Sequence, residues 1–225
     1  EKVHMLSAFA GDEGPQWLRS ALLAHYGPKK SAAILAAHQV DAPVDFTVKS
    51  DPGLWAEKLG GIALPNGTVR VARPDGSIPS LPGFAEGAWW VQDAAASLPA
   101  KLLGEIKGKR VLDLCAAPGG KTAQITHAGA IVTAVEVSAS RLRRLTSNLS
   151  RLGLNAETWT GSAFDYKPDE LFDAVLLDAP CSSTGTIRRH PDVAWTKQPA
   201  DVTKLAKLQY DLLAKAAEFV KPGGV

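Results

Sequence analysis

The sequence predicts an α/β fold in which a mostly parallel sheet carries helices on both faces. Strand and helix patterns alternate regularly after Trp89, and repeated β-α units of this kind form parallel sheets. The apolar run at residues 110–114 leads into a glycine-rich turn and then a helix, as in doubly wound folds that hold a nucleotide-like cofactor. The less regular first part of the chain predicts a small α+β module in front of this sheet.

The expected module covers residues 1–80, and a linker rich in proline and glycine at residues 81–87 opens the larger domain, which covers residues 81–225. Apolar spacing and turn residues predict the following elements of the module: helices at 15–26, 31–39 and 54–59, and strands at 44–48 and 68–72.

The elements of the larger domain follow from the same signals. Ser138 is expected to cap a helix whose leucines face one side and which ends at Gly153. The other expected elements are helices at 92–103, after Gly119 and at 201–220, and strands at 110–114, 131–137, 157–160 and 172–177.

The composition excludes several classes of protein. The chain has 225 residues with 45% apolar residues and a net charge of +2, and no apolar run approaches the roughly 20 residues of a membrane span. Residues 1–5 show no signal-peptide pattern, so we expect a cytoplasmic location and no membrane partner. We also expect the protein to be a monomer. The two cysteines, Cys115 and Cys181, have no metal-ligand spacing, so neither a metal site nor a disulfide is expected.

The glycine-rich turn at residues 115–121 predicts a cofactor site. Its paired glycines allow backbone N–H groups to approach a ligand at the positive end of the following helix. Glu136 ends the next strand, 23 positions after Asp113, near the spacing at which an acidic side chain meets a ribose. The turn has neither the dinucleotide nor the phosphate-loop pattern. A ligand with a ribose and without phosphates is therefore favoured.

A second group of reactive residues follows the apolar strand that ends at Leu177. Asp178 and Cys181 come directly after that strand, at the sheet edge where such folds do chemistry. A basic segment comes next, and it could hold an RNA backbone or be an ordinary solvated loop; it contains Arg188, Arg189 and His190, with Trp195 and Lys197 nearby. One helix also carries positive charge from Arg141, Arg143, Arg144 and Arg151, and several of these are expected only to solvate its outer face.

Together these segments resemble the RNA cytosine-5 methyltransferases of the RsmB (Fmu/Sun) type, which are relatives of the NSUN enzymes. Residues 113–122 resemble the S-adenosylmethionine loop of that family, residues 178–192 its active-site loop, and residues 81–94 its lead-in to the catalytic domain. The resemblance implies a class I methyltransferase fold, an N-terminal module that binds RNA, and methylation of C5 of a cytosine in RNA, with 16S ribosomal RNA as the expected substrate.

The resemblance also implies roles for individual residues. Asp178 would bind both the cofactor and the cytosine edge, and Arg188, Arg189 and His190 would contact RNA. The family usually has Asp at the positions of Glu136 and Ser162, so the loss of the carboxylate at Ser162 leaves Asp165 as an alternative contact to the adenine. The cofactor-binding residues implied are Cys115, Ala116, Ala117, Pro118, Gly119, Gly120, Lys121, Glu136, Ser162 and Asp178.

The two cysteines of the family divide the catalytic work. One thiolate adds to C6 of cytosine and makes C5 nucleophilic, while the cysteine that matches Cys181 assists release of the product. The attacking cysteine is expected in a Thr-Cys motif after Lys-Pro-Gly-Gly, and the sequence reaches Val225 at the start of that strand. We therefore expect the sequence to be a fragment whose nucleophile follows Val225.

Three alternatives remain open from the sequence. In a DNA cytosine-5 methyltransferase, Cys181 itself would attack the base. A transfer RNA could replace ribosomal RNA as the substrate. A catalytically silent module for RNA binding or assembly would bind the cofactor without transferring a methyl group.

Overall fold

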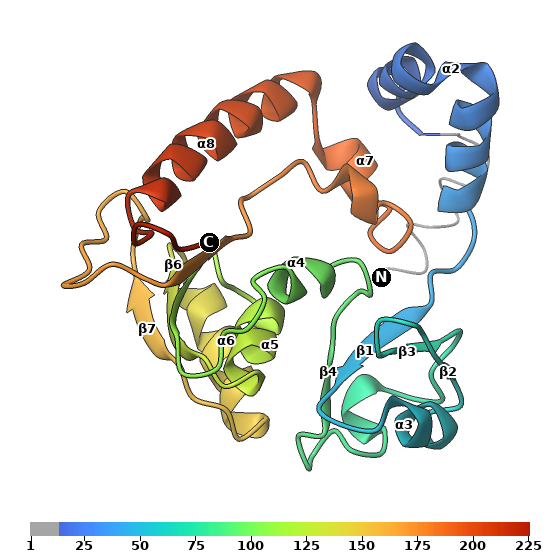
Figure 1. Ribbon diagram of the computed structural model, residues 1–225. Coiled ribbons are helices and arrows are strands. Elements are labelled where there is room, and N and C mark those ends of the chain that lie inside the picture. The colour runs from blue at the N-terminus through green and yellow to red at the C-terminus, as the bar shows by residue number, and fades with distance from the viewer. Residues whose placement is uncertain (1–13) are drawn as a thin grey trace. The chain divides into compact units, whose positions relative to one another are not determined.

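The computed structural model describes residues 14–225, so the first thirteen residues of the predicted module lie outside the described part (Figure 1). The described residues form two compact units. One unit contains residues 14–42 and 181–208, and the other contains residues 43–180 and 209–225. These bounds differ from the predicted division at residue 80. Across residues 14–225, no helix has both the length and the apolarity that a membrane crossing requires.

The larger unit contains a parallel sheet with the strand order β7-β6-β5-β8 (Figure 1). Its strands are β5 (Arg110–Leu114), β6 (Ile131–Glu136), β7 (Glu157–Thr160) and β8 (Ala174–Leu177). The central strand β5 pairs with β6 and β8, with Leu114 opposite Val135 and Leu177. The turns after β5 and β8 therefore leave the sheet side by side.

Two helices connect these strands, and both follow the predicted pattern. Helix α5 spans Gly120–His127, and helix α6 spans Ala139–Arg151 with Ser138 accepting a hydrogen bond from the backbone N–H of Arg141. Leu142, Leu145 and Leu149 of α6 are buried in one cluster with Ala134 of β6. A stripe of leucines at helical spacing thus covers the sheet, as the sequence predicts.

A small antiparallel sheet belongs to the same unit. Its order is β2-β3-β1-β4, and its strands are β1 (Val44–Val48), β2 (Ile62–Ala63), β3 (Thr68–Val71) and β4 (Trp89–Val91). Helix α3 (Pro52–Lys58) and a short 3-10 helix, η1 (Ile78–Ser80), accompany this sheet. Phe46 and Trp89 are fully buried in its core, with ring centroids 4.7 Å apart in an edge-to-face arrangement.

The predicted helix at residues 92–103 is wrong over most of its length. Only Leu98–Lys101 is helical, as α4, and Gln92 continues from strand β4 with its backbone N–H donating to Asp45. The reason is tertiary: the backbone N–H of Gln92 donates to strand β1, and the N–H groups of Ala94 and Ala95 donate to the side chains of Asp45 and Asp93, which hold these residues in turns. Phe172, predicted as strand, forms one isolated bridge with Val220 before β8 begins.

The smaller unit is built on helix α2 (Gln16–His38). Gly27 has a φ of 70° and breaks this helix into the two arms that the sequence predicts. A buried cluster joins Leu18 to Ile187 and Ala194, next to the 3-10 helix η2 (Thr184–Thr186) and helix α7 (Val193–Thr196). Helix α8 (Pro199–Ala217) contributes residues to both units.

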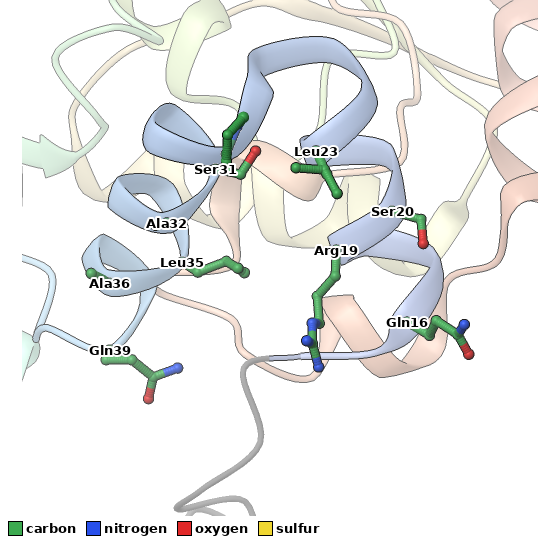
Figure 2. A pocket seen from close by; sticks show the side chains of 10 residues that line it. Gln16, Arg19, Ser20, Leu23, Ser31, Ala32, Leu35, Ala36 and Gln39 are labelled. Atoms are coloured by element: carbon green, nitrogen blue, oxygen red, sulfur yellow. The ribbon is translucent and has the colours of Figure 1, made fainter.

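A groove of about 870 Å³ lies between the two arms of α2. Figure 2 shows Gln16, Arg19 and Leu23 on the first arm, with Leu35 and Gln39 on the second. None of the site residues predicted from the sequence lines this groove.

Candidate cofactor site and active-site loop

The glycine-rich turn after β5 has a backbone that few sequences can adopt. Cys115 and Gly119 have φ values of 60° and 100°, and the Ala117–Pro118 peptide bond is cis. A Cβ atom on Gly119 would lie 2.8 Å from Cγ of Leu145, so position 119 requires glycine for both its backbone angle and its space. The turn delivers the chain to Gly120, where α5 begins with free backbone N–H groups.

Asp113 and Thr122 fasten the two ends of this turn to each other. The Thr122 hydroxyl donates to Oδ2 of Asp113 at 2.6 Å, and both residues are fully buried. Burial raises the pKa of Asp113 to about 7, because the low-dielectric interior disfavours the charged carboxylate. The other oxygen, Oδ1, is buried without a hydrogen-bond partner. This role of Asp113 was not predicted from the sequence, where the residue only marks the spacing to Glu136 and the start of the loop at residues 113–122.

Glu136 lies at the carboxyl end of β6, as predicted, but its carboxylate is almost completely buried. One oxygen accepts from the backbone N–H of Ala117 at 3.2 Å, and the other accepts from Ser138 at 3.0 Å. Glu136 therefore holds the cofactor turn against the end of β6. A carboxylate has about four acceptor positions, so these bonds leave capacity for a hydroxyl donor.

Arg141 is part of this arrangement and is therefore not one of the arginines that only solvate the outer face of α6. Its guanidinium lies 3.5 Å from the Glu136 carboxylate and donates to the carbonyl oxygen of Ala117 at 2.5 Å. Arg151 also points inward, with hydrogen bonds to the carbonyl oxygens of Phe84 and Trp89. Helical spacing alone does not separate arginines that solvate a helix from arginines that reach a neighbouring loop.

Asp178 meets the cofactor turn because β8 pairs with β5. Its backbone N–H donates to the carbonyl oxygen of Leu114 at 3.2 Å, and its carboxylate forms an ion pair with Lys121 at 2.6 Å. Lys121 is in the first turn of α5 and is mostly buried, whereas the Asp178 side chain is 55% exposed. The two motifs of the sequence are thus joined by a charge pair at one edge of the sheet.

Ser162 and Asp165 follow the next strand, β7, which borders β6. The backbone N–H of Gly161 donates to the carbonyl oxygen of Glu136 at 3.0 Å, so this turn also lies at the carboxyl edge of the sheet. The Ser162 hydroxyl accepts from the backbone N–H of Phe164, and Asp165 is exposed. Ser162 shapes its own turn and keeps a hydroxyl that can donate.

The two cysteines occupy opposite environments. Cys115 is partly buried, and its pKa is raised to about 11 by burial and by the nearby carboxylates of Glu136, Asp113 and Asp178. A thiol in such a site stays protonated at neutral pH and is a poor nucleophile. Cys181 is exposed, and its sulfur accepts from the backbone N–H of Ser183.

The basic segment after Cys181 folds within the smaller unit. Arg188 donates to the carbonyl oxygens of Val40 at 3.0 Å and Asp41 at 2.6 Å, so its guanidinium fastens the segment that follows α2. Arg189 and His190 are exposed. RNA binding by these three residues remains a prediction.

The comparisons with known proteins agree with this geometry. The family model of the 16S rRNA methyltransferase RsmB/F matches residues 100–225. The ribosomal RNA small subunit methyltransferase B of Enterobacter sp. is 38% identical over 242 residues, covering 100% of this chain and 56% of its own length. The chain thus spans about half the length of this relative.

Two solved structures from Pyrococcus horikoshii are similar to the chain. A methyltransferase homologue has a TM-score of 0.74 and 30% identity, with 88% of this chain and 67% of the other covered. NSun6 with SFG has a TM-score of 0.80 and 17% identity, with 93% and 81% covered, and it supports the fold alone. The match of the family model over more than half of the sequence decides the assignment: this chain belongs to the RsmB/F family of 16S rRNA methyltransferases.

Proposed function

We propose that this protein methylates C5 of a cytosine in 16S ribosomal RNA, with S-adenosylmethionine as the methyl donor. The observation that carries the proposal is the ion pair between Lys121 and Asp178, which joins the cofactor turn to the active-site loop at one edge of the sheet. Membership of the RsmB/F family supports the same reaction.

The residues of the turn fit S-adenosylmethionine chemically. The backbone N–H groups at the start of α5 are donors that suit the carboxylate of a methionine moiety. Glu136 has spare acceptor positions for ribose hydroxyls, and Ser162 or Asp165 is placed one strand further for the adenine. The turn from Cys115 to Lys121 would hold the methionine end. When bound, the cofactor supplies an electrophilic sulfonium methyl group.

Asp178 has the geometry to act on the base. Its carboxylate is half exposed while Lys121 holds it from the buried side, so one oxygen remains accessible to the ring of a cytosine. As a carboxylate, Asp178 would accept a hydrogen bond from the exocyclic amino group of the cytosine, and a proton held between Asp178 and N3 would offset the negative charge that develops at N3 when a thiolate adds to C6. After methyl transfer, which leaves S-adenosylhomocysteine, a base takes the C5 proton and the thiolate leaves C6, which restores the aromatic ring.

We assign the release step to Cys181 and place the attacking thiolate on a cysteine that follows Val225, as the family resemblance implies. Cys181 is exposed and directly follows the turn that contains Asp178, whereas the raised pKa of Cys115 argues against a nucleophilic role for that residue. We accordingly expect residues 1–225 alone to bind the cofactor with little or no turnover. Robust turnover by this chain would contradict the cysteine assignment.

Bisulfite sequencing of 16S ribosomal RNA tests the function. RNA from cells with and without the gene is compared, and we expect one 5-methylcytosine to disappear without it. An unchanged pattern would overturn the assignment. Loss of methylation in transfer RNA instead would move the substrate to that class. Cofactor binding by the complete protein without any change in RNA would favour the silent assembly module.

A further inference from the structure

The side chain of Gln92 lies in the interior of the larger unit, between the antiparallel sheet and helix α5. It is 7% exposed. Its amide oxygen accepts from the Thr47 hydroxyl at 2.7 Å and from the Trp90 indole at 3.0 Å. Its amide nitrogen donates to the carbonyl oxygen of Ala96 at 3.3 Å and to Oε1 of Gln124 at 3.2 Å. Two donors and two acceptor positions are thus all used, which fixes the orientation of the amide.

The backbone around Gln92 is anchored to strand β1. The N–H of Gln92 donates to the carbonyl oxygen of Asp45 at 3.0 Å, and the N–H of Ala94 donates to the Asp45 carboxylate at 2.9 Å. Asp45 is buried and is held by Arg70 through two hydrogen bonds of 2.7 Å each. The small sheet therefore provides a rigid support for Gln92.

The opposite side of Gln92 faces the start of α5. A Cβ atom built on Gly120 would lie 3.7 Å from Cγ, Cδ and Nε2 of Gln92, so this side chain packs directly against the backbone of the glycine turn. Gln124, one turn further along α5, donates to the carbonyl oxygen of Ser97 at 2.7 Å. The Gln92 side chain thus lies next to Gly120, the first residue of α5, and its amide donates a hydrogen bond to Gln124 one turn further along the helix.

We propose that Gln92 is a positioning residue for the methionine end of the methyl donor. By holding the start of α5, it orients the backbone N–H groups of Gly120 and Lys121 in this turn toward the donor's carboxylate, since the N–H of Gly119 already donates to the carbonyl oxygen of Ala116. The inference rests on the proposed function, because it assigns that turn to the methionine moiety. It gives the antiparallel sheet a part in cofactor binding, besides the RNA binding expected of the N-terminal module.

The test compares two ligands that differ only at the end in question. S-adenosylhomocysteine has the amino-acid carboxylate, whereas 5′-methylthioadenosine has the same adenosine end without it. Both are titrated by calorimetry against the full chain and against Gln92→Met, which keeps the length of the side chain and removes its hydrogen bonds. We expect the variant to bind S-adenosylhomocysteine roughly 10-fold more weakly, since small displacements of oriented groups are costly, and to bind 5′-methylthioadenosine unchanged.

Gln39→Met is the matched control. It makes the same substitution at an exposed glutamine of the smaller unit, so both affinities should stay as in the unchanged chain. Gln124→Met is a second variant that breaks the same link from the helix side, in case Gln92→Met does not fold by circular dichroism. It should reproduce the selective loss.

Each outcome decides between the possibilities. Equal weakening of both ligands would show that Gln92 supports only the fold, and unchanged binding of S-adenosylhomocysteine would overturn the proposal. Failure of the unchanged chain to bind S-adenosylhomocysteine would overturn the cofactor assignment itself, and the inference with it.

Discussion

The cofactor turn and the active-site loop differ in how firmly they are held. The turn at residues 115–121 is fastened by buried partners from other elements, including Glu136 of β6 and the neighbouring residue pair Asp113 and Thr122. Cys181 is exposed, and its sulfur contacts only Ser183, two residues further along the chain, although the carbonyl oxygen of the preceding Pro180 accepts from Gln209. The difference fits the proposed function, in which the turn is a preformed site for the donor and the segment at Cys181 stays accessible to RNA.

Gly119→Ala should have the largest effect on the rigid turn. Alanine at this position would be held in a left-handed backbone conformation, and its methyl group would collide with Leu145. We therefore expect the free energy of unfolding to fall by roughly 1–3 kcal/mol. Binding of S-adenosylhomocysteine should become about 100-fold weaker. Urea unfolding and calorimetry measure the two quantities. Gly185→Ala in the exposed loop is the control, because nothing lies within 4 Å of its new methyl group. Equal effects of the two variants would contradict the view that the cofactor turn is held more firmly than the exposed loop.

Glu136→Gln should weaken the turn to a smaller extent. One oxygen that accepts a backbone N–H would be replaced by an NH₂ group, which leaves a buried donor without an acceptor at a cost of about 1–3 kcal/mol. Thermal unfolding and the affinity for S-adenosylhomocysteine should both fall. Glu170→Gln removes an exposed carboxylate that pairs with Arg110 and should change stability by at most about 0.5 kcal/mol. If Glu136→Gln changed neither the thermal stability nor the affinity for S-adenosylhomocysteine, the turn would not depend on this carboxylate.

Asp113→Asn should change how stability depends on pH. The folded chain keeps the Asp113 proton up to a pKa of about 7, whereas the ordinary value is 3.8. The stabilisation from this raised pKa is complete below the ordinary value and is lost as the pH rises through 7. The stability of Asp113→Asn relative to the unchanged chain should therefore rise by up to about 1.4 kcal/mol per pH unit between pH 5 and 7. Urea unfolding at several pH values measures this slope, and a flat difference, like that expected for the exposed Asp75→Asn, would refute the burial argument.

Thiol labelling compares the two regions without altering stability. Iodoacetamide at pH 8 should modify the exposed Cys181 well before Cys115, because a pKa of about 11 leaves roughly one thiol in a thousand of Cys115 as thiolate. Mass spectrometry of peptides follows both rates. In the Cys181→Ser variant, raising the pH toward 10 should accelerate the labelling of Cys115. Similar rates for both cysteines at pH 8 would place them in similar environments.

The strands of the parallel sheet were predictable because their signals are local. Residues 110–114 and 157–160 are strands as predicted, and Ser138 caps α6 as predicted. An apolar run, a capping side chain and a terminating glycine act within a few residues, so the sequence displays them directly. The same holds for the cofactor turn, where the backbone at position 119 itself requires glycine.

The sequence by itself determined the four strands of the parallel sheet with helices α5 and α6 between them, the glycine turn and the placement of Asp178 after a buried strand. Only the tertiary structure decided that Gln92 leaves a strand and reaches α5, that Glu136 is turned inward onto Ala117, and that Arg141 joins it. These contacts link residues that are 5 to 32 positions apart across different elements. Which partner a side chain meets in another element depends on how the elements pack. That packing is determined by many residues together, so no local sequence pattern predicts the partner.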